Sequence, residues 1–304
     1  MKHIVSVSLG SDKRDHSVET EFMGEKFLIE RIGTNGDFDK AIALIREMDG
    51  KVDAFGMGGI DLYVYIADKS YTIKDAQRLV AAARKTPIVD GGGLKNTLER
   101  KCIMEVQEQG IVDLRGKKVL MVCAVDRFGM AEAFEDVGAK LIIGDFIYTV
   151  GLPIPIYSLK TLKFFGSIVA PFVVRMPFEK LYPTGEQQNV ITPKNSKYYH
   201  KADVLAGDFN YIRRWLPEKL DGQVVITNTT TADDLEMLKE RGISKVITTT
   251  PDMGGRSFGT NVIEALMITL MGKPLDQISP EDYYAMLQEL DLKPGVTDFT
   301  QQTA

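Results

Sequence analysis

The stretch from Leu94 to Asp145 constrains the fold more than any other part of this chain of 304 residues. Its pattern predicts a helix over 96–109, a strand over 117–123, a tight turn, a helix over 130–137 and a strand over 140–145. A helix between two short apolar strands forms a crossover, so we expect the two strands to be parallel. An acid that closes the second strand, roughly 20 residues after the turn, is typical of a dinucleotide-binding unit.

Strands and helices alternate on both sides of this stretch. The pattern favours an α/β fold, with a Rossmann-like parallel-sheet domain and an N-terminal α/β lobe on the substrate side. We expect the lobe to cover residues 1–110 and the nucleotide-binding domain to cover 111–275. The last segment, 276–304, is expected to form a C-terminal helix that packs back on the lobe.

Composition excludes several classes of partner. The net charge is −5 and no basic block occurs, which argues against nucleic acid as a partner. No apolar run reaches the roughly 20 residues of a membrane span. The two cysteines, Cys102 and Cys123, form no disulfide framework and no zinc motif, so we expect a cytoplasmic protein without a catalytic metal. The apolar segment 146–174 is either core or a contact in a homo-oligomer such as a dimer.

Residues 94–129 also carry a recognisable set of sequence motifs. Asn96-Thr97 lies on the first helix, Gly-Ile-Val-Asp-Leu-Arg-Gly-Lys-Lys-Val-Leu follows at 110–120, and the turn occupies 123–129. In order and spacing this resembles the shikimate/quinate dehydrogenase family, over about a fifth of the chain. The resemblance implies an NAD(P)-dependent oxidoreductase that acts on a small, anionic hydroxy or carbonyl compound, with Asn96 and Thr97 on the substrate side. Leu98 stands where the family has its catalytic Asp.

The turn after the first strand is the predicted phosphate site. Backbone N–H groups there can approach a pyrophosphate, and the predicted contacts are Ala124, Val125, Asp126, Arg127 and Gly129. The Asp126 carboxylate would lie beside phosphate charge, and Arg127 could offset it by pairing with either one. The alternative is a Rossmann-like fold in which Asp126 caps a helix and no nucleotide binds.

Polar residues at three further strand ends complete the predicted cofactor site. Asp145 would accept hydrogen bonds from ribose hydroxyls and repel a 2′-phosphate, which favours NAD over NADP. Thr227, Asn228, Thr229 and Thr250 resemble the strand ends that line the nicotinamide side in the dehydrogenase family. Helix capping by threonine is the alternative interpretation of these positions.

Two glycine clusters, at 56–59 and 91–93, each adjoin an acid, and a lysine follows the second cluster. We expect Lys95 to act as the acid–base group, with Asp90 or Asp61 assisting. The alternative is a solvated ion pair beside a turn. Further along, Arg256 and Ser257 lie in a glycine-rich loop before a helix and would bind a substrate anion, unless that loop is purely structural.

Two functions follow from these patterns. The first is an NAD-dependent oxidoreductase of a small-molecule substrate, in which the protein supplies orientation, charge and a proton donor or acceptor. The second is a non-catalytic Rossmann-like protein that binds or senses a nucleotide or small molecule. Leu98 and the glycine-poor turn favour the second.

Overall fold

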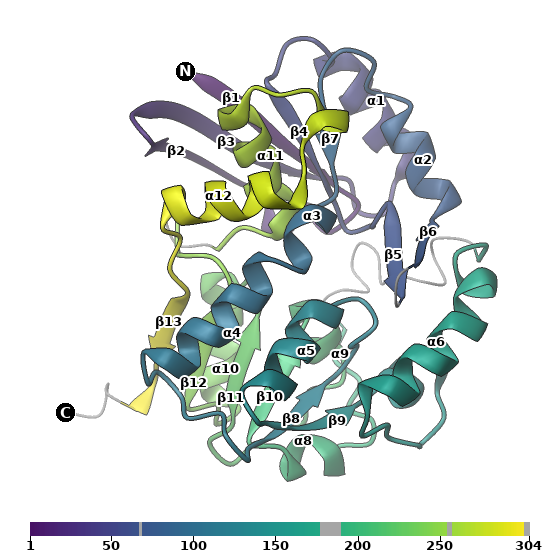
Figure 1. Cartoon of the computed structure of the whole chain (residues 1–304), viewed down its shortest axis with the longest axis vertical. Coiled ribbons are helices and arrows are strands. Elements are labelled where there is room, and N and C mark those ends of the chain that lie inside the picture. The colour runs from purple at the N-terminus through teal and green to yellow at the C-terminus, as the bar shows by residue number, and fades with distance from the viewer. Residues whose placement is uncertain (67–68, 177–189, 254–256, 301–304) are drawn as a thin grey trace.

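The computed structural model describes residues 1–66, 69–176, 190–253 and 257–300. Two α/β lobes lie one above the other, each around a mostly parallel sheet (Figure 1). The sheets have the strand orders β2-β3-β1-β4-β7 and β13-β12-β11-β10-β8-β9. The predicted α/β, Rossmann-like fold class is therefore confirmed. Among the described residues, no helix combines the length and the apolar character needed to cross a bilayer.

The first lobe is built on β1 (Lys2–Ser8), a strand buried between two parallel neighbours. Those neighbours are β3 (Glu25–Gly33) and β4 (Ala54–Gly58), and β7 (Ile88–Val89) pairs with β4. The edge strand β2 (His16–Phe22) is antiparallel to β3 and was not predicted, because its polar and charged residues obscure the alternation.

Helices and short elements complete this lobe. Helix α1 (Phe38–Met48) packs against β1 and against α2 (Lys74–Val80). A hairpin of β5 (Tyr63–Ile66) and β6 (Lys69–Thr72) projects toward α6 (Leu159–Val173). The short 3-10 helix η1, Asp12–Arg14, follows β1.

A helix from the far end of the chain covers the other face of the first sheet. Helix α11 (Thr260–Met271) packs on β4 and β1, and α12 (Pro280–Leu290) lies beside it. The predicted nucleotide-binding domain, 111–275, includes α11, whereas the structure packs it on the first lobe. The reason is its apolar face, where Val262, Ile263 and Leu266 share a core with Ile4 and Phe27.

In the second lobe, successive residues of a strand face two different layers of helices in turn. Its strands are β8 (Lys118–Met121), β9 (Lys140–Ile143), β10 (Val204–Gly207), β11 (Val224–Thr227), β12 (Lys245–Thr248) and the antiparallel β13 (Gly295–Asp298). Val119 and Met121 face the layer that contains α4 (Leu98–Glu108) and α5 (Phe128–Asp136). Leu120 faces the opposite layer, formed by α8 (Lys197–Lys201), α9 (Phe209–Arg214) and α10 (Ala232–Glu240).

Two local differences from the predicted elements affect the site. The helix predicted over 96–109 is found as α4, but a separate short helix, α3 (Gly92–Lys95), precedes it, with Asn96 and Thr97 at the break between the two. Asp145 does not end a strand, because β9 stops at Ile143 and Asp145 begins a π-helix, Asp145–Val150. Both changes turn polar groups of these segments toward the chain's own backbone.

Candidate functional site

A cleft of about 950 Å³ lies between the two lobes, and we call it the interlobe cleft. Its walls come from the ends of β1 and β4 in the first lobe and from the residues after β8, β10 and β11 in the second. Carboxyl ends of parallel strands face the cleft from both sides, which is where open α/β sheets place their ligands. Seven of the predicted site residues line it: Asp61, Asp90, Lys95, Asp126, Arg127, Asn228 and Thr229.

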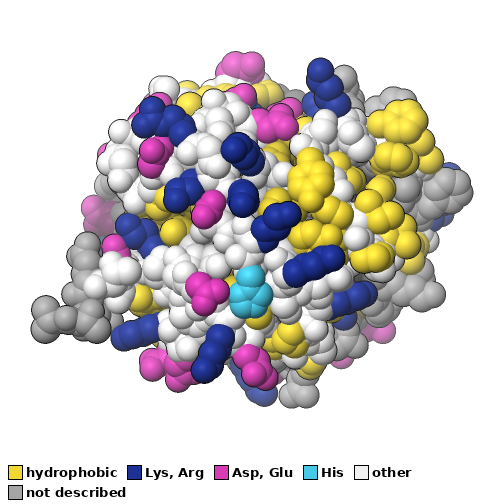
Figure 2. Space-filling model, turned by 90° about the horizontal axis from the view of Figure 1, so that it is seen from below, with side chains coloured by type: hydrophobic (Ala, Val, Ile, Leu, Met, Phe, Trp, Pro, Cys, Tyr) yellow, Lys and Arg dark blue, Asp and Glu magenta, His cyan; other side chains and the backbone are white. Residues whose placement is uncertain are grey.

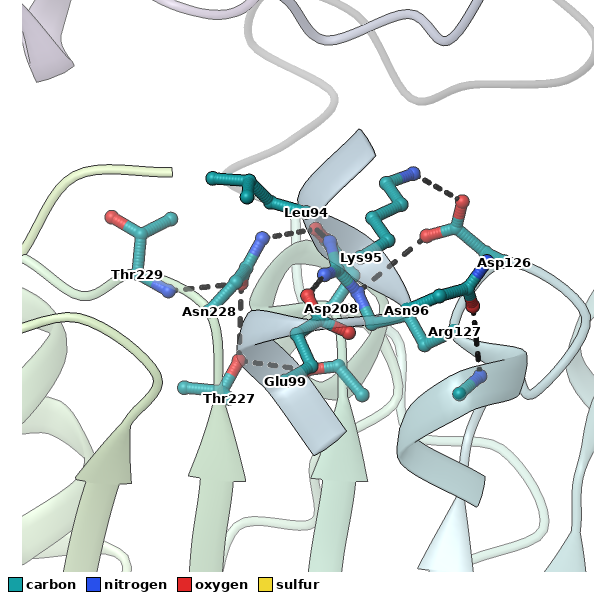
Figure 3. A network of polar contacts seen from close by, with 12 residues as sticks. Leu94, Lys95, Asn96, Glu99, Asp126, Arg127, Asp208, Thr227, Asn228 and Thr229 are labelled. Carbon is teal, nitrogen blue, oxygen red and sulfur yellow. Dashed lines mark hydrogen bonds and ion pairs between the residues drawn. The ribbon is translucent and has the colours of Figure 1, made fainter. Parts of the chain in front are cut away.

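Lys95 bridges two carboxylates at the centre of the cleft. It is the last residue of α3, and its Nζ lies 2.7 Å from Asp61 Oδ1 and 2.7 Å from Asp126 Oδ1. Asp61 follows β4, and Asp126 belongs to the turn after β8, so three distant segments meet here. Figure 3 shows the Lys95 side chain pointing to Asp126. We call these three residues the Lys95 cluster.

Charge in this cluster is unevenly divided. Burial opposes the charged form of Lys95, but Asp126 and Asp61 outweigh it and raise the pKa of the ammonium above its usual value. Burial, with repulsion from Asp61, raises the pKa of Asp126 to about 8 despite the attraction of Lys95. Burial acts on Asp61 as well, but Lys95 and a hydrogen bond with Asp126 lower its pKa. The two carboxyl groups therefore share one proton near neutral pH, as close carboxylate pairs do.

This division changes the predicted roles. The sequence predicts Lys95 as the acid–base group, with Asp90 or Asp61 assisting. In the structure the Lys95 ammonium stays charged, and the member of the cluster that titrates near neutral pH is Asp126. The predicted alternative, a Lys95–Asp90 ion pair, is replaced by the pairs with Asp61 and Asp126.

Two further acids lie at and behind the cleft floor: Asp90 lines the cleft, and Glu264 is buried behind it. Asp90 accepts hydrogen bonds from the N–H groups of Leu62 and Gly92, and burial, followed by repulsion from Asp61, raises its pKa. Behind it, Glu264 of α11 accepts from the Gly91 N–H and from the Tyr283 hydroxyl, each at 2.7 Å. Burial, with repulsion from Asp90, raises the pKa of Glu264 to about 7. Sequence reasoning missed Glu264, because it stands alone among apolar helix residues.

Arg127 is buried beneath the Lys95 cluster. Its guanidinium hydrogen bonds to Glu99 and lies 3.1 Å from Asp208 Oδ2 (Figure 3). The Asn228 amide donates to the same Asp208 oxygen at 2.7 Å, and its carbonyl oxygen accepts from the Thr229 N–H. Arg127 is thus compensated inside the second lobe, and Asn228 orients its acid partner.

The predicted phosphate turn makes its hydrogen bonds within the chain. The N–H groups of Ala124 and Val125 donate to the Asp145 carboxylate at 2.9 and 3.0 Å. The Gly129 N–H donates to Asn96 Oδ1 at 3.2 Å, which closes the N-terminal end of α5. These are the donors that a pyrophosphate needs. In this arrangement the turn does not fit a dinucleotide on its backbone amides.

The remaining predicted residues are buried beside the cleft without lining it. Hydroxyl groups of Thr97, Thr227 and Thr250 donate to backbone carbonyl oxygens, and Ser257 Oγ accepts from the Thr230 N–H. They stabilise loops, whereas the helix capping of the alternative interpretation is performed by Thr231, whose Oγ1 accepts from the Asp234 N–H. Arg256 lies outside the described residues. No group of three or more His, Cys, Asp or Glu residues in the described part of the chain is arranged to hold a metal ion.

Two arginines in the first-lobe wall were missed. Arg14 of η1 and Arg31 of β3 line the cleft, and each is 8% exposed. Arg31 resembles an ordinary polar residue of an alternating strand, and Arg14 resembles an exposed turn residue. Only the folded arrangement of β1, β3 and η1 brings them to the cleft.

Comparison with known proteins places the chain in a family. A family model described as a domain of unknown function (DUF8754) matches residues 93–299, and a second (DUF8753) matches residues 3–90. The chain belongs to the DUF8754 family. The junction between the two matched regions falls at α3, which carries Lys95. No curated protein matches the chain.

Several solved structures are similar at low identity. Hetero-hexameric glutamate dehydrogenase from Thermus thermophilus is 12% identical, with 95% of this chain and 73% of that chain covered and a TM-score of 0.43. The A chain of dipicolinate synthase from Bacillus subtilis is 10% identical, with 95% of each chain covered and a TM-score of 0.31. NAD-dependent malic enzyme from Thermotoga maritima is 11% identical, with 83% and 67% covered and a TM-score of 0.31. Similarities of this size carry no argument about ligand or activity.

Proposed function

We propose that this protein is an enzyme that performs acid–base chemistry on a small hydroxy or carbonyl compound bound in the interlobe cleft. The observation that carries the proposal is the position of Lys95 Nζ, 2.7 Å from each of two carboxylates. A charged ammonium beside a carboxyl group that titrates near pH 8 is costly to build for stability alone. Such shifted pairs in a cleft are typical of catalytic sites.

The roles of the residues follow from their charges. Lys95 would donate a hydrogen bond to the substrate oxygen and stabilise negative charge that develops on it. Asp126, or the proton it shares with Asp61, would accept a proton from a hydroxyl group or give one to a carbonyl oxygen. Arg127 would keep the turn that carries Asp126 fixed, through Glu99 and Asp208.

The finer proposal is an NAD-dependent oxidoreductase of the shikimate/quinate dehydrogenase type. Its support is the resemblance over residues 94–129 and a parallel sheet whose strand ends face the cleft. A nicotinamide cofactor would supply hydride transfer. Because Asp145 and Asn96 occupy the donors of the turn, we assign no step of the reaction to that cofactor.

An activity screen tests the proposal. Purified protein is incubated with small hydroxy acids and NAD or NADP, and the absorbance of the reduced nicotinamide is followed. In Asp126→Asn and Lys95→Ala variants we expect a loss of about 100-fold or more in kcat. Asp113→Asn is the matched control, since that side chain is 63% exposed and remote from the cleft, and it should keep full activity. Undiminished turnover in both cluster variants would remove the assignment.

A second candidate is a non-catalytic binding or sensor protein. The closed turn favours it, because Ala124, Val125 and Gly129 already have acceptors within the chain. Titration with NADH and NADPH, followed by nicotinamide fluorescence and thermal stability, separates the candidates. No response to either nucleotide, together with saturable stabilisation by a small carboxylate, would support the sensor.

We further propose a cytoplasmic homo-oligomer. Its support is the apolar surface of α6 and the segment before it, where Phe164, Ile154 and Tyr157 are 63%, 56% and 59% exposed. Figure 2 shows apolar side chains gathered at the right, the side on which α6 lies in Figure 1. Exposed patches of this kind mark protein contacts. Sedimentation of wild type and Phe164→Ser protein tests it, and a monomer at every concentration would contradict it.

A further inference from the structure

We infer that the first-lobe wall of the interlobe cleft carries an oxyanion subsite built from Arg14 and Arg31, which holds a carboxylate or phosphate group of the substrate. That the bound compound is a substrate rests on the proposed function. Binding of the oxyanion itself does not.

Position is the first argument. Both arginines line the same cleft as the Lys95 cluster, and both are more than nine-tenths buried. They come from two neighbouring segments. The short helix η1 begins soon after the end of β1, and every residue of β1 pairs with β3. Buried guanidinium groups are rare and need anionic partners; each arginine has one carboxylate within the chain, and both also line the open cleft.

Orientation is the second argument. Arg31 donates to the Ser11 carbonyl oxygen, to Asp15 Oδ1 and to Ser8 Oγ, at 2.8–2.9 Å. Arg14 Nη2 lies 3.1 Å from Asp234 Oδ2 of α10, in the opposite lobe. These contacts fix two planar guanidinium groups, and planar guanidinium groups bind the two oxygens of carboxylate or phosphate in matching geometry.

Local charge is the third argument. Arg14 and Arg31 are close enough to repel each other, although Asp234 pairs with Arg14 and Asp15 and Asp12 attract Arg31. Burial and repulsion from Arg14 lower the pKa of Arg31 to about 10. Burial, and more weakly Arg14, also lower the pKa of Arg213, against the attraction of Asp234. Like charges held together in a buried site are costly, and a bound oxyanion would offset that cost.

Among the described lining residues, the other two cations, Lys95 and Arg127, stand beside carboxylates. Lys95 is balanced by Asp61 and Asp126, which share one proton, and Arg127 stands against two carboxylates, Glu99 and Asp208. The cleft therefore has an acid–base end rich in carboxyl groups and another end where two arginines lie together. It suits a compound with an oxyanion at one end and a hydroxyl or carbonyl group at the other.

Binding of two simple anions tests the subsite. Inorganic phosphate and malonate are titrated into the full chain by calorimetry, at constant ionic strength set with chloride. We expect saturable binding of at least one anion, and the stronger of the two identifies phosphate or carboxylate as the better fit. Arg14→Gln should weaken binding by about tenfold or more, and Arg31→Lys, which keeps the charge but loses the fork, should also weaken it. Arg115→Gln is the matched control, because Arg115 is 73% exposed and lies away from the cleft.

The outcomes separate this inference from the proposed function. Wild-type affinity in both Arg14→Gln and Arg31→Lys, with folding verified by circular dichroism, would overturn the subsite, as would the absence of saturable binding to wild type. Loss of anion binding in the variants, with no turnover of any substrate by wild type, would leave the subsite standing and remove the enzyme. Turnover that changes neither with Arg14→Gln nor with the charge of the substrate would leave the enzyme standing and remove the subsite.

Discussion

Asp126 is the side chain through which pH acts on this site. Its side chain is largely but not fully buried, at 21% exposure, and it lies beside Asp61; both effects outweigh the attraction of Lys95 and hold its pKa at about 8. The native state keeps this proton up to about pH 8, whereas an unfolded chain releases it near 3.8. The native state thus binds more protons between these values, and its stability must fall as the pH rises through this window.

The first prediction concerns the slope of the free energy of unfolding against pH. The Asp126→Asn variant carries no titrating group at this position, so its free energy of unfolding should fall less steeply between about pH 4 and pH 8, by about one proton. Urea denaturation at a series of pH values measures the slope. Asp39→Asn is the control, because that side chain is 94% exposed, and it should keep the wild-type slope. An unchanged slope in Asp126→Asn would mean that the buried proton resides elsewhere.

Glu264 gives a second prediction at the same scale. Its raised pKa, about 7, means that its contribution to stability is fully present below about pH 4.5 and is lost as the pH rises through 7. The Tyr283 hydroxyl stabilises the charged form by donating to Oε1. Tyr283→Phe should therefore cost about 1–2 kcal/mol at about pH 8.5 and less at about pH 5.5. Tyr284→Phe, on the same helix but 48% exposed, should cost little at either pH. An equal cost of Tyr283→Phe at both values would contradict a charged Glu264.

Among the elements, the break between α3 and α4 does most to shape the site. It turns Asn96 toward the start of α5, where the Asn96 side chain accepts from the Gly129 N–H. The same approach leaves no room at Gly129, since an added Cβ would lie 2.8 Å from Asn96 Cα. The two helices are therefore locked together at the point where a dinucleotide fold places phosphate.

The sign of the stability change in Gly129→Ala tests this close approach. In an open helix the change would stabilise by about 0.5–1 kcal/mol, because alanine is the better helix former. Here the clash with backbone should destabilise by about 1–3 kcal/mol. Thermal and urea denaturation measure the difference, and Asn96→Ala, which removes the acceptor without a clash, is the companion variant. A stability equal to or above wild type in Gly129→Ala would show that α3 and α5 are not locked.

The elements that sequence reasoning predicted are those with regular apolar periods. The strand before the turn, the helix after it and β9 lie within a few residues of their predicted positions, because Val119, Met121 and Phe134 follow the periods of a strand and a helix. The short helix α3 was missed because its four residues, which begin with Gly92-Gly93, carry no helical apolar period. Gly91, at a φ of 90°, starts α3, and nothing in a single sequence reveals that constraint.

On the scale of the whole molecule, the chain builds its first lobe from both ends. The first sheet receives α1 and α2 from nearby sequence on one face, but α11 and α12 from the last fifth of the chain on the other. The interlobe cleft lies between lobes that the chain joins at α3 and again before α11, and the chain crosses once more from α12 to β13. Lys95 and Glu264 lie on the first two of these crossings, so their environment depends on both lobes.

This arrangement explains which site residues sequence reasoning could reach. Lys95, Asp61 and Asp126 were each predicted, because polar residues at strand ends of an α/β fold gather at one edge. Their mutual contact was not predicted, since it joins segments from two lobes. Arg14 and Arg31 were missed for the same reason, because their burial depends on β1, β3 and η1 packing beside the second lobe.

The last prediction follows from the dependence of the first lobe on α11. Val262, Ile263, Leu266, Met267 and Ile268 are all at most 4% exposed, and burial of such side chains contributes about 1.5–3 kcal/mol each. Their sum is comparable with the whole stability of a small domain, about 5–15 kcal/mol. A fragment of residues 1–110 should therefore show no cooperative thermal transition by circular dichroism, and should bind a dye for exposed apolar surface. The same fragment joined by a flexible linker to residues 257–292 should regain a cooperative transition, since the linker can be long at little entropic cost. A cooperative transition in the short fragment alone would mean that α11 covers a lobe already stable without it.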